Sequence, residues 1–424
     1  MSLAVLVALF VLFMAGVPIA VSLALAGVIG LEFFSNLPLL LVAQRMFVGI
    51  DSFPLMAIPF FILAGNLMSA GGISERLVDL AKSIIGGIQG GLACTCVLTC
   101  MIFASVSGSS VATTFAIGAI LIPAMVRHGY PRPTAAAIQA VSAELGVLIP
   151  PSIPLILFGV ATETSIGQLF IAGIGPGVLI GLSLIVFLAV WCRLRGYGLR
   201  DGEDRMALWP AFKRSAIALL MPVVVIGGIY GGVFTPTEAS AVAVFYALAV
   251  GMILYRELKF RDLPAILRQT MISTSVIMFI IAAAALFSFI LTRAGVPSAI
   301  GAMASELFTE KWSFLLAVNL LLLIVGMFIE TSAAILVLAP ILTPIAIGFG
   351  VDPVHFGVIV VVNLALGMCT PPLGVNLFAA CSVARISLDR IVPALVPFIL
   401  VILGCLMAVT YLPFISIGLR DLLY

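Results

Sequence analysis

The sequence predicts an all-α polytopic membrane protein built as an inverted-topology repeat. Of its 424 residues, 63% are hydrophobic and 9% are charged, whereas soluble globular proteins carry about 25% charged residues. The apolar residues form long continuous runs, as in membrane helices, and do not alternate with polar residues as in barrel strands. Two of these runs share one pattern of glycine and proline, which indicates a duplication.

The apolar runs divide the chain into membrane segments. A helix that crosses the hydrocarbon core needs about 20 predominantly apolar residues. Segment 2–15 is short for a span, and we include it because its counterpart 215–233 is long enough. The predicted segments are 2–15, 17–34, 53–71, 92–125, 134–162, 169–192, 215–233, 237–255, 269–292, 313–348, 354–384 and 391–416.

Two of these segments contain prolines in their interior and are predicted to be broken helices. Residues 143–154 read Ala-Glu-Leu-Gly-Val-Leu-Ile-Pro-Pro-Ser-Ile-Pro, and residues 363–374 read Asn-Leu-Ala-Leu-Gly-Met-Cys-Thr-Pro-Pro-Leu-Gly. A proline inside a helix removes a hydrogen bond and clashes with the preceding turn, at a cost of about 3 kcal/mol. Apolar segments interrupted by Gly and Pro at corresponding places of two halves are typical of a transport site.

Equivalent residues define the two halves. Gly146 and Pro151 correspond to Gly367 and Pro372 at one constant spacing of 221 residues (367 minus 146, and 372 minus 151). We therefore predict a first repeat over residues 1–192 and a second over residues 215–424. Residues 193–214, which are rich in arginine, form the linker between them.

The basic residues predict opposite orientations for the two repeats. The positive-inside rule places the linker in the cytoplasm. The same rule places both ends of segment 92–125 inside and both ends of segment 313–348 outside, so each is predicted to be a re-entrant hairpin. Each half then has about five crossings, one of them broken, plus one hairpin, and both chain termini lie outside.

A charged segment precedes the first hairpin. Residues 73–91 place Glu75, Arg76 and Asp79 opposite Leu77 and Leu80 at helical spacing. We interpret this pattern as an amphipathic arm lying in the membrane interface.

Each predicted hairpin has polar residues at its middle. Residues 105–114 read Ser-Val-Ser-Gly-Ser-Ser-Val-Ala-Thr-Thr, and Glu330, Thr331 and Ser332 stand at the corresponding place of the second hairpin. Non-helical backbone at membrane depth persists only where it is buried in protein or lines a wet cavity. The tips are therefore predicted to bind a hard cation such as sodium through carbonyl and hydroxyl oxygens. The alternative is that small residues there only allow close helix packing.

Two carboxylates and two amides lie within the apolar segments. An ionised carboxylate at the membrane centre costs about 2.5–3.5 kcal/mol on insertion scales, so Glu144 and Glu330 are expected to face a cavity or a partner. We interpret Glu330 as structural, bonded to backbone amides, and leave Glu144 open between that role and protonation. Asn363 and Asn376 bracket the second break, although such amides are often interhelical hydrogen-bonding groups.

The residues favour transport over catalysis. The chain has no P-loop, so an ion gradient is the expected source of energy. Neither His128 nor His355 has a nucleophile or a second metal ligand beside it in the sequence, which argues against hydrolytic and zinc chemistry. A membrane enzyme and the membrane anchor of a signalling complex are the alternatives from other classes.

Five motifs together resemble the large membrane subunit of tripartite ATP-independent periplasmic (TRAP) transporters. They are distributed over essentially the whole chain and are specific as a set. They read Phe-Val-Gly-Ile-Asp-Ser-Phe-Pro-Leu-Met-Ala-Ile-Pro-Phe-Phe at 47–61, Ser-Gly-Ser-Ser-Val-Ala-Thr-Thr at 107–114, Leu-Ile-Pro-Pro-Ser-Ile-Pro at 148–154, Thr-Pro-Thr-Glu-Ala at 235–239 and Thr-Pro-Pro-Leu-Gly-Val-Asn-Leu at 370–377.

The resemblance implies a sodium-driven, elevator-type importer of a small organic acid in the bacterial inner membrane, with both termini in the periplasm. The acid is a C4-dicarboxylate, sialic acid or another sugar acid. Two partners are implied, a separate small four-helix membrane subunit (Q-type) and a periplasmic substrate-binding protein (P-type). A proton-coupled organic-anion carrier using Glu144 or Glu330 is the alternative. Segments 17–34, 169–192, 237–255 and 391–416 are expected to form the scaffold, and the hairpins and broken helices the mobile transport domain.

The resemblance also implies two sodium sites, each between a hairpin tip and the neighbouring broken helix. Glu330 and Thr331 replace Ser109 and Ser110 in the second hairpin, so its ligands are less well defined. By motif, the first site involves Ser107, Gly108, Ser109, Ser110, Gly146 and Pro150, and the second Glu330, Thr331, Ser332, Gly367, Thr370 and Pro371. The residues expected to bind substrate are Ser107, Ser109, Thr113, Ser152, Asn363 and Asn376.

Overall fold

The chain folds into helices joined by short connections. The computed structural model describes residues 2–35, 37–199 and 206–423, and no strand occurs among them. The first half comprises α1 (Ser2–Met14), α2 (Ile19–Phe34), α3 (Leu40–Ile50), a short 3-10 turn (Phe53–Met56), α4 (Ala57–Ala70), α5 (Ile73–Ile85), α6 (Gly91–Ser107), α7 (Ser110–Arg127), α8 (Arg132–Ala143), α9 (Leu145–Leu148), α10 (Ile153–Thr162) and α11 (Ile166–Arg195). The second half comprises α12 (Leu208–Tyr230), α13 (Pro236–Leu248) with a π-helical extension (Ala249–Leu254), a 3-10 turn (Phe260–Asp262), α14 (Leu263–Arg293), α15 (Val296–Leu307), α16 (Lys311–Phe328), α17 (Thr331–Gly348), α18 (Pro353–Met368), α19 (Val375–Ala384), α20 (Leu388–Tyr411) and α21 (Phe414–Leu423).

The helices confirm the predicted membrane fold class. In the described part of the chain, nine helices are long and apolar enough to cross a membrane, and the pair Arg132–Leu148 and Ile153–Thr162, bent by 43°, makes up to ten. That bent pair is the predicted first broken helix. The 13 residues of α1 reach about 20 Å, short of the roughly 30 Å hydrocarbon core.

Both predicted hairpins are pairs of helices joined at a short tip. The first consists of α6 and α7, with Gly108 and Ser109 between them, and the second consists of α16 and α17, with Ile329 and Glu330 between them. Each hairpin is followed by a helix that breaks at a Pro–Pro sequence, over residues 149–152 and 369–374. The sequence therefore predicted these elements and the places of their interruptions.

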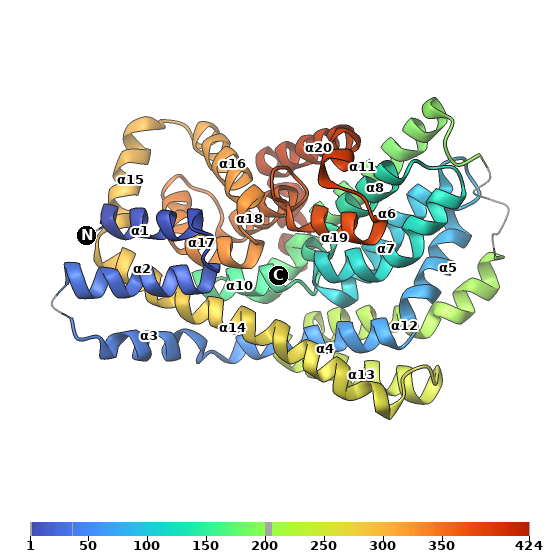
Figure 1. Ribbon diagram of the computed structural model, residues 1–424, viewed down its shortest axis with the longest axis horizontal. Coiled ribbons are helices and arrows are strands. Elements are labelled where there is room, and N and C mark those ends of the chain that lie inside the picture. The colour runs from blue at the N-terminus through green and yellow to red at the C-terminus, as the bar shows by residue number, and fades with distance from the viewer. Residues whose placement is uncertain (1, 36, 200–205, 424) are drawn as a thin grey trace.

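The helices form two groups (Figure 1). Along the lower side of the view, α14 packs against α2, α3 and α4, and α13 packs against α4 and α12. We call α1–α4 and α12–α14 the first layer. Above it lie the two hairpins, the two broken helices, α11, α20 and α21, which we call the hairpin layer. The arms α5 and α15 connect the layers, because each contacts helices of both.

The hairpin layer includes two helices that the sequence analysis assigned to the scaffold. Segments 169–192 and 391–416 were expected beside α2 and α13, but α11 packs on α6, α18 and α20, and α20 packs on α8 and α18. Small residues allow this approach, since a Cβ added to Gly173 would lie 2.7 Å from the Leu148 oxygen. Trp191 and Phe398, whose ring centroids are 5.4 Å apart, join α11 to α20. These two segments therefore pack against the hairpins and broken helices, and their assignment to the scaffold stays a prediction.

Several helix boundaries also differ from the prediction. α12 begins at Leu208, so the linker expected over 193–214 is partly helical, and its Arg200 and Arg205 lie outside the described residues. The segment 391–416 is divided between α20 and α21. The helices α3 and α15 were not predicted. Residues 40–70, which fold as α3, the turn and α4, nonetheless match α14 (263–293) at a spacing of 223 residues at both ends (263 minus 40, and 293 minus 70).

The predicted amphipathic arm is the helix α5, and its polar face contacts protein. The guanidinium of Arg76 lies 2.6 Å from Glu257, beyond the π-helical extension of α13. Asp79 pairs with Arg214 of α12 at 2.8 Å. Two ion pairs thus attach this arm to the first layer, and its position in the membrane interface stays a prediction.

Candidate functional site

The first hairpin tip lies directly against the first break. α6 ends at Ser107, and Gly108 has φ +62° before α7 begins. The Ile153 amide donates to the Gly108 carbonyl at 3.4 Å. A Cβ at Gly108 would lie 2.8 Å from the Pro151 oxygen. Only glycine tolerates both this positive φ and this close approach, which explains the residue at 108.

Hydroxyl and carbonyl oxygens gather around this tip. Thr113 Oγ1 donates to the Ser109 carbonyl at 2.7 Å and lies 2.9 Å from Ser107 Oγ. A Cβ added to Gly146 would lie 2.8 Å from Thr113 Oγ1 and 2.9 Å from the Ser109 oxygen, so the first break touches the same group. Ser107 and Thr113 are buried. Uncharged oxygens in a buried group are ligands that a hard cation accepts, and this donor set fits a sodium ion.

Other predicted residues of the first site lie close by but have further contacts. Pro150 and Ser152 are buried within the break. The Ser152 hydroxyl donates to the Val147 carbonyl and accepts from the Leu155 amide at 3.3 Å, so it stabilises the start of α10. Its hydroxyl thus already has two partners in the fold.

The second tip is organised by a carboxylate. Glu330 precedes α17, and its Oε2 accepts from the amides of Ser332 and Ala333 at 2.9 and 3.3 Å. Its Oε1 accepts from the Ser332 hydroxyl at 2.9 Å. These bonds confirm the interpretation that Glu330 bonds to backbone amides. A carboxylate at a helix N-terminus also interacts favourably with the helix dipole.

The second tip also lies against its own break. The Gly374 amide donates to the Met327 carbonyl at 3.2 Å. A Cβ added to Gly367 would lie 2.5 Å from Gly326 Cα, so α18 and α16 touch through backbone. Thr370 Oγ1 donates to its own helix at Leu366 (2.7 Å). Pro371, the last residue predicted for the second site, is half-buried in this break.

The two tips converge on Met368. Thr331 Oγ1 of the second tip lies 2.8 Å from Met368 Sδ, and Ser110 Oγ of the first tip lies 3.9 Å from the same sulfur. Met368 is buried immediately before the second break. The sequence analysis missed this residue, because an apolar side chain in an apolar run gives no local signal.

The two predicted substrate amides are engaged with protein. Asn363 Nδ2 donates to the carbonyl and the side-chain oxygen of Asn319 at 2.9 and 2.7 Å. Asn376 Nδ2 donates to Glu144 Oε1 at 2.6 Å. Their assignment to the substrate remains a prediction, and neither amide nitrogen points freely into a cavity.

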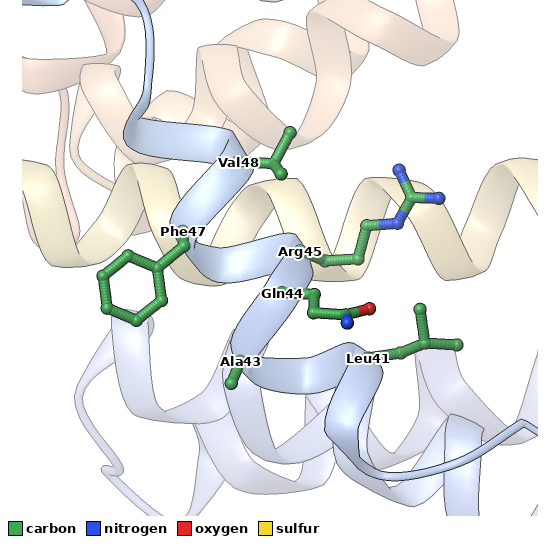
Figure 2. Close-up of a pocket in the computed structure, with 6 residues that line it drawn as sticks. All are labelled: Leu41, Ala43, Gln44, Arg45, Phe47 and Val48. Carbon is green, nitrogen blue, oxygen red and sulfur yellow. The ribbon is translucent and has the colours of Figure 1, made fainter.

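Two surface hollows lie away from the tips. One, of about 600 Å³, is lined by residues of α3. Figure 2 shows Arg45, Gln44 and Leu41 projecting from the same stretch of this helix. It includes no tip or break residue. A second, of about 570 Å³, lies where Thr235 at the start of α13 meets Glu163 after α10, so it adjoins both layers.

Paired helical hairpins that face paired broken helices define a class of protein, the polytopic helical membrane transporter subunit. The family model described as "Tripartite ATP-independent periplasmic transporter, DctM component" matches residues 6–415, and the chain belongs to this family. Its members are transporter permeases and not enzymes.

Individual relatives agree with this assignment. The chain is 40% identical over 431 residues to the C4-dicarboxylate TRAP transporter large permease protein DctM of Rhodobacter capsulatus, covering 98% of each chain. It is 45% identical over 410 residues to the isethionate TRAP transporter permease protein DctMQ of Oleidesulfovibrio alaskensis, covering 95% of this chain and 64% of that one. The crystal structure of the Alcanivorax borkumensis YdaH transporter superposes with a TM-score of 0.66 at 15% identity, covering 89% of this chain and 87% of that one, which supports the fold.

Proposed function

We propose that this chain imports a small organic acid across the bacterial inner membrane, driven by sodium and by an elevator movement of the hairpin layer. The acid is delivered by a P-type periplasmic binding protein, and a Q-type small subunit completes the membrane complex. Relatives named for C4-dicarboxylates and isethionate support an organic acid. Sialic acid and other sugar acids belong to the same proposed substrate class.

The observation that carries the sodium proposal is the buried oxygen group at the first tip. Ser107 Oγ, Thr113 Oγ1 and the Ser109 carbonyl lie within hydrogen-bond distance of one another, beside Gly146 of the break. The hydroxyl protons of Ser107 and Thr113 both have acceptors within the group, and lone pairs on its oxygens are left over. A bound sodium ion would use these lone pairs.

The layer arrangement supports the elevator proposal. A Cβ added to Gly65 of α4 would lie 3.3 Å from Ser107 Cα, so the first tip lies against the first layer. The second hairpin contacts the same layer through α17 and α14. The first tip and the helix α17 of the second hairpin thus lie beside the boundary along which the hairpin layer would move. The second sodium site would use Thr370 and backbone carbonyls near Gly367, because the Glu330 carboxylate is engaged with its own helix.

Uptake into proteoliposomes that hold this chain and its Q-type subunit, supplied with the P-type protein, tests the proposal. The substrate is first identified as the ligand that the P-type protein retains after purification. Two sodium ions entering with a monoanion move one net positive charge, worth about 2.3 kcal/mol per 100 mV. Uptake should therefore require external sodium and, for a monoanionic substrate, increase with an inside-negative potential. Uptake indifferent to both contradicts the coupling.

A matched pair of variants tests the first tip. Thr113→Val keeps the side-chain shape and removes the hydroxyl, which should raise the sodium concentration for half-maximal uptake about 5-fold, as expected for roughly 1 kcal/mol. The control is Thr162→Val at the end of α10, whose hydroxyl bonds to Phe158 and Thr164. Equal sodium dependence in the two variants contradicts a role for the Thr113 hydroxyl.

One observation favours the proton-coupled alternative. Glu144 Oε2 is buried and has no hydrogen-bond partner in the described parts of the chain, whereas both oxygens of Glu330 are bonded. If protons drive uptake, an inward pH gradient without sodium should support accumulation, and Glu144→Gln should abolish it. Accumulation that needs sodium and ignores the pH gradient excludes this alternative.

A further inference from the structure

A side-chain hydrogen bond joins the broken helices of the two halves. Asn376 Nδ2 donates to Glu144 Oε1 at 2.6 Å, across 232 positions of the chain. Glu144 lies between α8 and α9, and Asn376 lies in the first turn of α19. The two residues are 2% and 0% exposed. We call this buried pair the inter-repeat seam.

Two oxygens of the seam have no partner. Glu144 Oε2 and Asn376 Oδ1 accept no hydrogen bond from any described residue. The 2.6 Å bond between the two side chains and the bond lengths of the amide and the carboxylate keep Oδ1 within about 7 Å of Glu144 Oε2. The two open acceptors therefore lie at the same place in the fold. Two buried oxygen acceptors without a donor are destabilising unless a proton, a water molecule or a cation satisfies them.

No described cation of the protein compensates this carboxylate. The ion pairs in the described residues involve the acidic side chains of Glu257, Asp79, Asp262, Asp352 and Asp421, and none involves Glu144. A buried carboxylate without a charged partner is strongly unfavourable. Compensation therefore comes from a proton on Glu144, as in the proton-coupled alternative, or from a bound cation.

The seam is separate from the oxygen group at the first hairpin tip. Gly146 faces Ser109 and Thr113 of the hairpin, whereas the Glu144 side chain reaches α19. Residues two apart on a helix do not share a face, so these two directions diverge. An ion at the seam would have the first break on one side and the second break on the other.

We propose that Glu144 Oε2 and Asn376 Oδ1 bind a sodium ion at the inter-repeat seam, in addition to the two hairpin-tip sites. This inference rests on the proposed sodium-coupled function. An all-oxygen donor set suits a hard cation. The bound ion neutralises a carboxylate that would otherwise repel an anionic substrate in the same layer. Because each half supplies one ligand, the ion also holds the two breaks together.

Equilibrium binding of radioactive sodium to the purified full-length chain in lipid nanodiscs tests the site directly. Glu144→Gln preserves shape and an acceptor for the Asn376 amide, but it removes the charge. It should lower the number of sodium ions bound at saturation by one. The control, Glu306→Gln, changes an exposed carboxylate of α15 and should bind as many ions as the unmodified chain. Asn376→Ala, made separately, should also lose one ion.

The sodium ions bound outside the seam show whether a variant is folded and whether the proposed function holds. A Glu144→Gln protein that still binds the other ions is folded, so the loss of one ion belongs to the seam. If Glu144→Gln and Asn376→Ala both bind as many ions as the unmodified chain, the seam site is overturned and the tip sites stand. If the unmodified chain binds no sodium, the sodium-coupled function is overturned together with the seam site.

Discussion

The two hairpin tips occupy equivalent places in the chain but hold their second helices differently. α7 begins after Ser109, whose hydroxyl accepts a long bond from the Ala112 amide (3.4 Å). α17 begins after Glu330, whose carboxylate accepts from two amides and one hydroxyl. Charged acceptors make stronger bonds than hydroxyls. The first tip therefore gathers uncharged oxygens that can bind a ligand, whereas the second uses its charge to stabilise its own helix.

The two breaks differ in exposure as well. Residues 150–152 are fully buried, whereas Pro372 and Leu373 are exposed. The preceding hairpin helices follow the same trend, since α6 buries most of its residues and α16 a minority. The two halves thus share a backbone plan, in which each tip bonds to its own break, while the surroundings and the side-chain chemistry differ. Equivalent substitutions in the two halves should consequently have unequal effects.

The largest difference is expected between Gly367→Ala and Gly146→Ala. A Cβ at 367 would meet three backbone atoms of Gly326 at 2.5–3.0 Å, and backbone cannot rotate away. A Cβ at 146 would meet the Thr113 hydroxyl, a side-chain group, as well as the Ser109 carbonyl. We expect Gly367→Ala to destabilise the protein by about 3 kcal/mol and Gly146→Ala by about 1 kcal/mol. Thermal unfolding of the purified proteins measures both, and equal shifts contradict the comparison.

The caps should show a smaller difference. Glu330→Ala leaves two amides at the start of α17 without an acceptor, at a cost of about 2 kcal/mol. Ser109→Ala removes one long bond and should cost about 0.5 kcal/mol. Ser109→Ala retains the Ser109 carbonyl, so it should change the sodium concentration for half-maximal uptake only a little. Thermal unfolding and sodium titration of uptake check the two statements, and a Ser109→Ala protein less stable than Glu330→Ala reverses our ranking.

Local signals in the sequence predicted both hairpins and both broken helices. Gly108 and the Pro–Pro pairs interrupt helices by their own backbone restrictions, so their effects do not depend on distant residues. The carboxylate of Glu330 beside Ser332 is likewise a local capping arrangement. Hydropathy located most of the remaining helices, because every spanning helix needs a long apolar run.

Contacts between distant helices could not be predicted from the sequence. All spanning helices are similarly apolar, so hydropathy does not show that α11 and α20 pack in the hairpin layer. The bond from Asn376 to Glu144 joins residues 232 positions apart, and neither residue's neighbours in the chain indicate the other. The convergence of Ser110 and Thr331 on Met368 could not be predicted for the same reason. Such contacts depend on how the two halves fit together.

The ends of the two halves provide the smallest expected effect. α11 runs without interruption to Arg195, whereas α20 stops at Tyr411 and is followed by α21, a helix that the first half lacks at this place. Arg420 of α21 donates from Nη1 to both oxygens of Asp352, at 2.9 and 2.8 Å. Asp352 also accepts from the Val354 and His355 amides, so it fixes α21 to the start of α18.

The Asp352 pair should give a pH-dependent contribution to stability. Partial burial alone would raise the pKa of Asp352, but the Arg420 guanidinium and the His355 and Val354 amides hold that pKa below its usual range. A carboxylate with a depressed pKa stabilises the fold at pH values above its unfolded pKa of about 3.9. This stabilisation is lost as pH falls through the folded pKa. At 33% exposure of the Asp352 side chain, solvent screening limits the contribution to about 1 kcal/mol. Asp352→Asn should therefore be less stable than the unmodified protein at pH 7, and the gap should narrow as pH falls below about 4. Thermal unfolding across this range measures the gap, with exposed Asp389→Asn as the control, and a gap that is constant with pH contradicts the assignment.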